Sequence, residues 1–228
     1  MRSASSILLA IDSSTRIVGL ALYDGVQVLS ESSWSSMDYH TVELAPAVAE
    51  ALDKASIHYE ALGALAVALG PGSFTGLRIG MALAKGLALA RHLPIVGIPT
   101  LDILAAAQPI RQTRLAAVLR AGRGRLAVGW YEAKSNAWKI AKDVEVCTPE
   151  ELARQIDQPT FVCGELSEAE REFLGHNHPD VLLASPAQSL RRPGFLAELA
   201  WKRWKAGATD NPASLSPIYL HYNDPIPG

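Results

Sequence analysis

The stretch Gly-Pro-Gly-Ser-Phe-Thr-Gly-Leu-Arg-Ile-Gly occupies residues 70–80 and continues as an alanine-rich run to residue 90. It predicts a strand over residues 66–69, a glycine-rich turn, and a long helix with Ser73 or Thr75 as its N-cap. Because glycine within a helix costs about 1 kcal/mol relative to alanine, small residues at regular spacing need a physical reason. Close approach of another backbone or of a ligand is such a reason. The ridge of small residues, one every four positions, is Gly76, Gly80, Ala84 and Ala88.

The composition is that of an ordinary globular protein. The chain has 228 residues, of which 49% are hydrophobic and 19% charged, and its net charge of −2 provides no overall positive field for nucleic acid. Two cysteines, Cys147 and Cys163, are too few for a disulfide framework. The apolar run at residues 7–11 is too short for a signal sequence or a membrane span. We therefore expect a cytoplasmic protein without membrane association.

Hydrophobic patterning predicts the same order of elements twice. In the first half, Pro46 should blunt or kink the first turns of the first helix. The first half is expected to hold strands at 7–11, 17–23 and 26–30, a helix at 42–55, the strand and helix described above, a strand at 95–98 and a helix at 101–107. In the second half, Thr148 and Glu151 form a capping box at the start of a helix. The second half is expected to hold strands at 115–119, 126–131 and 138–146, that helix, a strand at 161–163, a helix at 167–173, a strand at 181–184 and a helix at 193–205.

Two βββαβαβα lobes in tandem indicate an α/β fold of the actin, sugar kinase and Hsp70 ATPase type, which has a ligand cleft between its lobes. The expected division is a first lobe at residues 1–109, a second lobe at 110–210, and a tail at 211–228 that packs on a lobe surface. A fold of this kind does not by itself fix function.

Four segments carry a resemblance to a known family. They are residues 11–15 (Ile-Asp-Ser-Ser-Thr), 19–22 (Gly-Leu-Ala-Leu), 70–80 and the closing Pro-Ile-Tyr-Leu at 217–220. Together they resemble the TsaB family, also called YeaZ, and they lie mainly in the first half of the chain. The resemblance implies a non-catalytic protein that supports bacterial synthesis of threonylcarbamoyladenosine, a modified base beside the tRNA anticodon.

The resemblance also implies partners and an interface. The partners are the catalytic paralogue TsaD and the ATPase TsaE, with self-association through the same face when TsaD is absent and only indirect contact with tRNA. Helices at residues 41–55 and 75–91 would pack against the equivalent helices of TsaD. The implied interface residues are Thr41, Leu44, Val48, Leu52, Gly76, Gly80, Met81, Ala84 and Ala88. No tightly bound cofactor is expected, and the sequence leaves open whether ATP or ADP binds at the partner interface.

The residues that could serve nucleotide hydrolysis form only half a site. Asp12 in the first turn has the carboxylate that this fold uses near phosphates and Mg²⁺, but residues 120–125 of the second lobe (Arg-Ala-Gly-Arg-Gly-Arg) have none. Ala121 stands where the resembled family usually has an acidic residue nearby. Asp12 is either this half-site or a residue that hydrogen-bonds its own turn. The candidate residual nucleotide or anion site is Asp12, Ser13, Ser14, Gly72, Ser73 and Arg78.

The glycine-rich turn favours packing over phosphate binding. Backbone N–H groups at a helix start can bind an anion, but Lys85 lies too far along the helix for a P-loop lysine. Arg78, Lys85 and His92 leave one narrow polar stripe, so the helix is expected to be buried nearly all round. Arg78 is equally compatible with a phosphate or carboxylate contact and with a simple surface position.

Other chemistry is not indicated. No two histidines are spaced four apart on a predicted helix, and His176 and His178 are expected in a loop, so no metal site is predicted. The arginines at 111–125 either face tRNA phosphates in an assembly or, as is more common for such charges, form a solvated face, and no RNA-binding motif is present. The favoured hypothesis is a non-catalytic scaffold. The alternatives are a stand-alone ATP-binding enzyme that uses Asp12 and, more weakly, a metallopeptidase.

Overall fold

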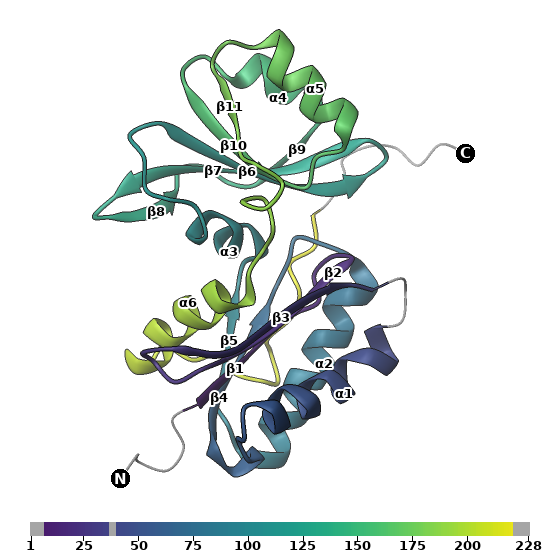
Figure 1. Ribbon diagram of the computed structural model, residues 1–228, viewed down its shortest axis with the longest axis vertical. Helices are drawn as coiled ribbons and strands as arrows, with labels where there is room; N and C mark the ends of the chain where they lie inside the picture. The colour runs from purple at the N-terminus through teal and green to yellow at the C-terminus, as the bar shows by residue number, and fades with distance from the viewer. Residues whose placement is uncertain (1–6, 37–39, 221–228) are drawn as a thin grey trace.

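The computed structural model describes residues 7–36 and 40–220, except for the side chains of His40, Thr41 and Asn177. Two α/β lobes lie one above the other and are joined by segments that cross between them (Figure 1). Each lobe has a mixed sheet with helices on both faces. The predicted fold class, two tandem lobes of the same element order, is confirmed.

The first lobe is built on a five-stranded sheet of order β3-β2-β1-β4-β5. β1, β2 and β3 form an antiparallel meander, and β4 and β5 add parallel strands beyond β1. The bounds are β1 (Ile7–Asp12), β2 (Ile17–Tyr23), β3 (Val28–Ser35), α1 (His40–Lys54), a 3-10 turn η1 (Tyr59–Ala61), β4 (Leu62–Ala68), α2 (Phe74–Arg91), β5 (Ile95–Ile98) and α3 (Thr100–Ala106). Pro46 lies within α1 rather than blunting its start.

The second lobe repeats this plan with a six-stranded sheet. Its order is β11-β10-β6-β7-β8, and β9 also pairs with β7. The bounds are β6 (Arg114–Gly122), β7 (Arg125–Lys134), β8 (Ala137–Ile140), β9 (Glu145–Cys147), α4 (Pro149–Gln155), β10 (Thr160–Gly164), α5 (Glu168–Asn177), β11 (Val181–Leu183) and α6 (Pro193–Lys205). The predicted capping box of Thr148 and Glu151 is present at the start of α4.

The lobes exchange their last helices. Side chains alternate along β1, so Leu9 and Ile11 face α1 and α2, while Leu8 and Ala10 face the opposite side. That opposite side is covered by α6, which comes from the end of the second half of the chain (Figure 1). In return, α3 packs on the sheet of the second lobe. The expected division at residues 109 and 110 follows the chain, whereas the two cores each contain a helix from the other half.

Two local predictions are wrong. The single strand expected at residues 138–146 is two strands, because β8 pairs with the far end of β7 and β9 pairs with residues 126–128 of the same strand. The loop expected around His176 is helical, because α5 continues to Asn177 and His178 is its C-cap. The start of this helix is as expected and is fixed by a second capping box, formed by Ser167 and Glu170; only its C-terminal end lies further along the chain than expected.

The described part of the tail lies against the first lobe. The Ile218 N–H donates to the Leu69 carbonyl at 2.7 Å, and the Tyr219 ring lies 5.1 Å from that of Phe74. The tail therefore joins the glycine-rich turn at the start of α2, as far as residue 220; residues 221–228 are outside the described part. Among the described residues, no helix has the length and apolar character needed to cross a bilayer.

Candidate functional site in the cleft between the lobes

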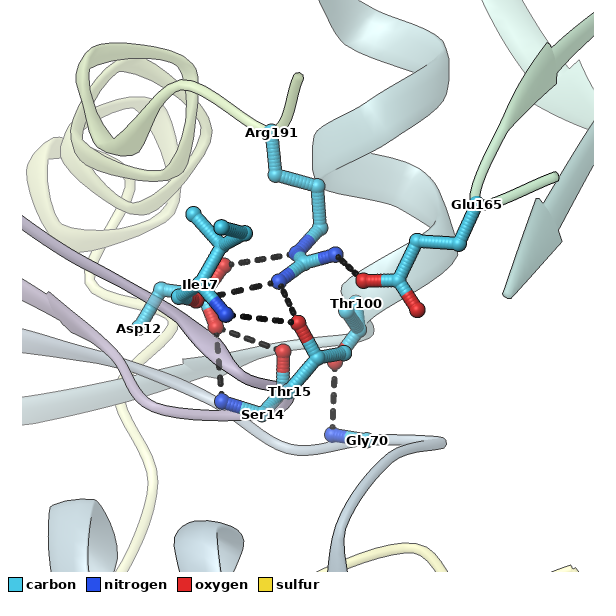
Figure 2. Close-up of polar contacts among 8 residues, drawn as sticks. All are labelled: Asp12, Ser14, Thr15, Ile17, Gly70, Thr100, Glu165 and Arg191. Carbon is cyan, nitrogen blue, oxygen red and sulfur yellow. Dashed lines mark hydrogen bonds and ion pairs between the residues drawn. The ribbon is translucent and has the colours of Figure 1, made fainter. Parts of the chain in front are cut away.

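The glycine-rich turn is fixed at both ends. Ser73 is the N-cap of α2, and its hydroxyl accepts from the Gly76 N–H at 3.3 Å, so the structure selects Ser73 over Thr75. On the other side, Gly70 exchanges two hydrogen bonds with Thr100, at 3.0 and 2.8 Å (the first is drawn in Figure 2). Since Thr100 begins α3, the turn is attached directly to the helix that crosses between the lobes.

The ridge of small residues on α2 receives the turn between β1 and β2. A Cβ atom built on Gly76 would come closer than 3.0 Å to the Ser13 carbonyl oxygen, and one on Gly80 would collide with the Ser13 hydroxyl. A Cβ atom built on Gly72 would likewise collide with the Ser14 carbonyl oxygen. The Ser13 hydroxyl donates to the Gly76 carbonyl at 2.8 Å. The close approach that the glycines permit is therefore an intramolecular one.

The side chains that the family resemblance assigned to a partner interface lie inside the first lobe. Leu44, Val48 and Leu52 are each at most 2% exposed, and the set as a whole packs against the sheet. The other buried members are Gly76, Gly80, Met81, Ala84 and Ala88. The prediction that these residues contact a partner directly is therefore corrected. Their apolar periodicity marks the face of each helix that packs on the core. The side chain of Thr41 is outside the described residues.

The outer face of α2 is open to solvent, so the expectation of a helix buried nearly all round is wrong. Leu89 is 67% exposed, and a Cβ atom added to Gly86 would meet no other atom within 4 Å. Arg78 is exposed on the same helix, where its guanidinium lies 3.8 Å from the Phe74 ring centroid and its Nε donates to the Tyr219 hydroxyl at 3.1 Å. Arg78 therefore holds the tail against the start of the helix.

Asp12 lies at the end of β1 and is only 2% exposed. Its Oδ1 accepts from the Ser14 N–H at 2.9 Å and from the Ser14 hydroxyl. This confirms the interpretation of Asp12 as a residue that hydrogen-bonds its own turn. The other carboxylate oxygen, Oδ2, makes an ion pair of 3.0 Å with Arg191, a residue that the sequence did not single out.

Arg191 joins the two lobes at the base of the cleft (Figure 2). Its side chain is 3% exposed, and besides Asp12 it donates to the Glu165 carboxylate at 2.9 Å, to the Thr15 hydroxyl and to the Ile17 carbonyl at 3.2 Å. Burial alone would lower the pKa of Arg191, but the charges of Asp12 and Glu165 outweigh burial and raise that pKa. The guanidinium is therefore a permanent buried cation between two carboxylates, one from each lobe.

In this arrangement Asp12 is buried and ion-paired, so a hydrated metal ion would have to displace Arg191 to reach its carboxylate. Across the cleft, the β6–β7 turn bears arginines and no carboxylate, as the sequence indicated. Among the described residues, no three histidine, cysteine, aspartate or glutamate side chains are grouped so as to hold a metal. The side chains present do not fit the magnesium–nucleotide chemistry that the fold supports elsewhere.

Arg191 was missed because 179 residues separate it from Asp12. One local signal was available. Arg191 and Arg192 directly precede α6, whose first turn contains no acidic residue. Cations at a helix N-terminus oppose the helix dipole, so they indicate carboxylate partners elsewhere in the fold. Arg192 indeed pairs with Glu31.

The lobes, the exchanged helices and the cleft define a protein of the actin-like ATPase fold in which the carboxylate at the end of β1 is bound by an arginine. A solved activator of 2-hydroxyisocaproyl-CoA dehydratase from Clostridium difficile shares this fold, with a TM-score of 0.52 at 9% identity over 88% of this chain and 96% of that one. The family described as "TsaD: tRNA N6-adenosine threonylcarbamoyltransferase" matches residues 27–185.

Closer relatives define the family within this class. A Bacillus subtilis protein described as "tRNA threonylcarbamoyladenosine biosynthesis protein TsaB" is 30% identical over 200 residues, which are 84% of this chain and 86% of that protein. The solved YeaZ from Pseudomonas aeruginosa superposes with a TM-score of 0.79 at 28% identity, covering 94% of this chain and all of that one. The chain belongs to the TsaB (YeaZ) family.

Proposed function

We propose that this protein is a non-catalytic subunit that binds and supports a TsaD-like catalytic subunit in the synthesis of threonylcarbamoyladenosine in tRNA. The Bacillus subtilis relative is described as a biosynthesis protein for this nucleoside. The state of the cleft supports a role without catalysis. Asp12 is ion-paired with Arg191, and the opposite turn at residues 120–125 has no carboxylate, so the two hairpin turns do not offer the pair of carboxylates that would hold the metal ion of a stand-alone ATPase reaction.

The surface proposed to bind the catalytic subunit is the outer face of α1 and α2, not the buried residues of these helices. We define the outer helix face by its exposed small and apolar residues: Val42, Ala45, Ala49, Ala82, Gly86 and Leu89. Val42 is 64% exposed and Leu89 is 67% exposed, and the small residues between them allow another helix to approach closely.

Gly86 is the observation that carries this proposal. It lies in the interior of an 18-residue helix, where glycine costs about 1 kcal/mol relative to alanine. Unlike Gly76 and Gly80, it has no atom within 4 Å of a Cβ position, so nothing within the described chain requires a glycine there. A helix backbone packed across Gly86 would require one.

The test compares two substitutions of the same glycine. Gly86→Trp places a bulky side chain on the outer helix face and should weaken binding to the cognate TsaD-like protein by about tenfold or more, since overpacking an interface displaces the partner. Gly86→Ala adds one methyl group and serves as the matched control, with a much smaller loss. Binding is measured by calorimetry and by co-elution on a sizing column. Equal affinity of the tryptophan variant and the unaltered protein would exclude this face.

The same face is proposed to mediate a homodimer when the catalytic subunit is absent. A TsaE-like ATPase is proposed to join the complex through the catalytic subunit, and tRNA to contact this protein only indirectly. The partner interface is also the place proposed for ATP or ADP. Gly86→Trp should therefore shift the isolated protein toward a monomer in sedimentation, and it should cause no clash within the chain because Gly86 has open space around it.

A further inference from the structure

A cavity of about 1010 Å³ lies between the lobes, in front of the Arg191 ion pairs. Small-molecule sites have volumes on the order of 300–1,000 Å³ and occur preferentially where domains meet. The walls come from the β1–β2 turn, the start of α2, the β6–β7 turn, the end of β10 and the tail. They combine apolar surface, from Ile17, Pro71, Phe74 and Leu166, with a few charged groups.

The charged groups of the cavity wall favour an anion. Arg16 from the first lobe and Arg120 from the second line opposite walls, and both are exposed. Glu165 is the one carboxylate of the described wall residues, and it is already bound by the Arg191 guanidinium at 2.9 Å and by the Arg120 backbone N–H at 3.5 Å. Glu170 lies 3.4 Å from the Arg120 guanidinium and offsets part of its charge. Because Arg191 is the single cation between Asp12 and Glu165, the ion-paired groups add no positive charge to the wall, and the exposed guanidiniums of Arg16 and Arg120 are the groups that can meet an anion.

The start of α2 adds donors and an aromatic surface to the same cavity. Within the described residues, the backbone N–H groups of Phe74 and Thr75 have no hydrogen-bond partner, and Ser73 and Phe74 line the wall. The Phe74 and Tyr219 rings lie 5.1 Å apart with a 35° tilt, and Phe74 is 54% exposed. A flat apolar group can pack on these rings while an anionic group meets the arginines.

We propose that this cavity binds a small organic anion, a carboxylate or a phosphate monoester, that carries a flat apolar group and needs no divalent metal. Binding is independent of metal because Asp12, the carboxylate that would hold the ion, is buried and ion-paired with Arg191. The site does not depend on the scaffold role proposed above, since it lies in the cleft and not on the outer helix face. Either can hold while the other fails.

Three naphthalene probes test the site on the full chain in the presence of EDTA. They are 2-naphthyl phosphate, 2-naphthoate and neutral 2-naphthol, which share one flat body and differ in charge. At least one of the two anions should bind saturably with one site per chain, and naphthol about fivefold or more weakly. The tighter anion identifies the source as a phosphate or a carboxylate compound. Absence of saturable binding by both anions, equal binding of naphthol, or a requirement for Mg²⁺ would each overturn the proposal.

Substitutions then locate the binding. Arg16→Ala and Arg120→Ala should each weaken the tighter anion by about fivefold, because each removes one charged donor from the wall. Ala121→Trp should abolish binding by filling the cavity from the second lobe. Arg123→Asn is the matched control: it removes a charge from the same exposed turn, outside the cavity wall, and asparagine tolerates the positive φ of 52°. Unchanged affinity of both alanine variants, or an equal loss in Arg123→Asn, would contradict the site.

Discussion

The turns that close the first hairpin of each lobe occupy equivalent places in the fold and have opposite surroundings. In the first lobe, Asp12, Ser13 and Ser14 are each at most 2% exposed and are bound from three directions. In the second lobe, Gly122 and Gly124 have no atom within 4 Å of a Cβ position, and Arg123 between them is exposed. The shared topology therefore does not imply shared chemistry. One turn is a buried structural junction, and the tip of the other is exposed at the edge of the cleft.

The difference follows from what a buried carboxylate requires. A charge removed from water must be paired and hydrogen-bonded, because otherwise its desolvation is strongly unfavourable. Asp12 meets this requirement through Ser14 and Arg191, and Arg191 in turn needs Glu165 from the other lobe. The buried turn thus fixes the second lobe relative to the first without a ligand. The exposed turn has no such requirement and tolerates a run of arginines.

The largest effect is expected from Arg191→Met, which removes the cation between the lobes. Two carboxylates would remain without their partner, and breaking a buried ion pair from one side costs about 3–5 kcal/mol. Urea unfolding should show this loss in the free energy of unfolding. The matched change in the other turn, Arg120→Met, removes an exposed ion pair with Glu170 and should cost about 1 kcal/mol or less.

A triple variant separates charge from packing at this junction. Combining Arg191→Met with Asp12→Asn and Glu165→Gln removes the uncompensated charges and should recover part of the stability lost in the single variant. This combination also keeps the comparison measurable where the single variant folds too weakly to study. Equal losses for Arg191→Met and Arg120→Met would show that the two turns are energetically alike.

The second prediction concerns the helix that the buried turn packs against. Gly76→Ala forces a methyl group onto the Ser13 carbonyl, which is backbone and cannot rotate away, so unfolding should become easier by about 1–3 kcal/mol. Gly86→Ala, in the same helix but on the outer face, should instead stabilise by about 0.5–1 kcal/mol through helix propensity. Thermal unfolding of the two variants should show a lower stability for Gly76→Ala and a higher stability for Gly86→Ala. A stabilising Gly76→Ala would refute the close packing of turn and helix.

Local chemistry explains what could be predicted from the sequence. Short stretches of sequence are enough to recognise the order of elements and the caps at Ser73 and Thr148. The same holds for the absence of a carboxylate at residues 120–125. The four-residue spacing in α1 and α2 correctly indicates one apolar face on each helix, although α2 is not buried nearly all round as expected. It could not tell whether Leu44 or Gly80 faces the core or a partner, since both settings select the same residue types. The structure assigns these two residues to the core.

Contacts between distant segments explain what could not be predicted. Arg191 and Asp12 are brought together only because α6 crosses back to the first lobe, and no spacing in the sequence encodes that exchange. The sequence pattern does not distinguish Gly76 and Gly80, which accommodate Ser13, from Gly86, which has nothing near it. The sequence indicated that these glycines needed a reason, and tertiary packing determines which reason applies to each.

The smallest predicted effect distinguishes a glycine required by left-handed backbone from a glycine required by close packing. Gly124 has a φ of 70° and open space around it, so Gly124→Ala should cost about 1 kcal/mol through backbone strain alone. Gly124→Asn should restore most of that loss, because asparagine tolerates left-handed backbone.

Gly72 beside the buried turn should behave differently. Its Cβ position collides with the Ser14 carbonyl and its φ is not left-handed, so alanine and asparagine should both destabilise, the larger side chain more. Melting temperatures of the four variants decide the matter. Rescue by asparagine at Gly124 but not at Gly72 would establish strain in one lobe and packing in the other. Rescue at both positions would mean that the buried turn is no more closely packed than its exposed counterpart.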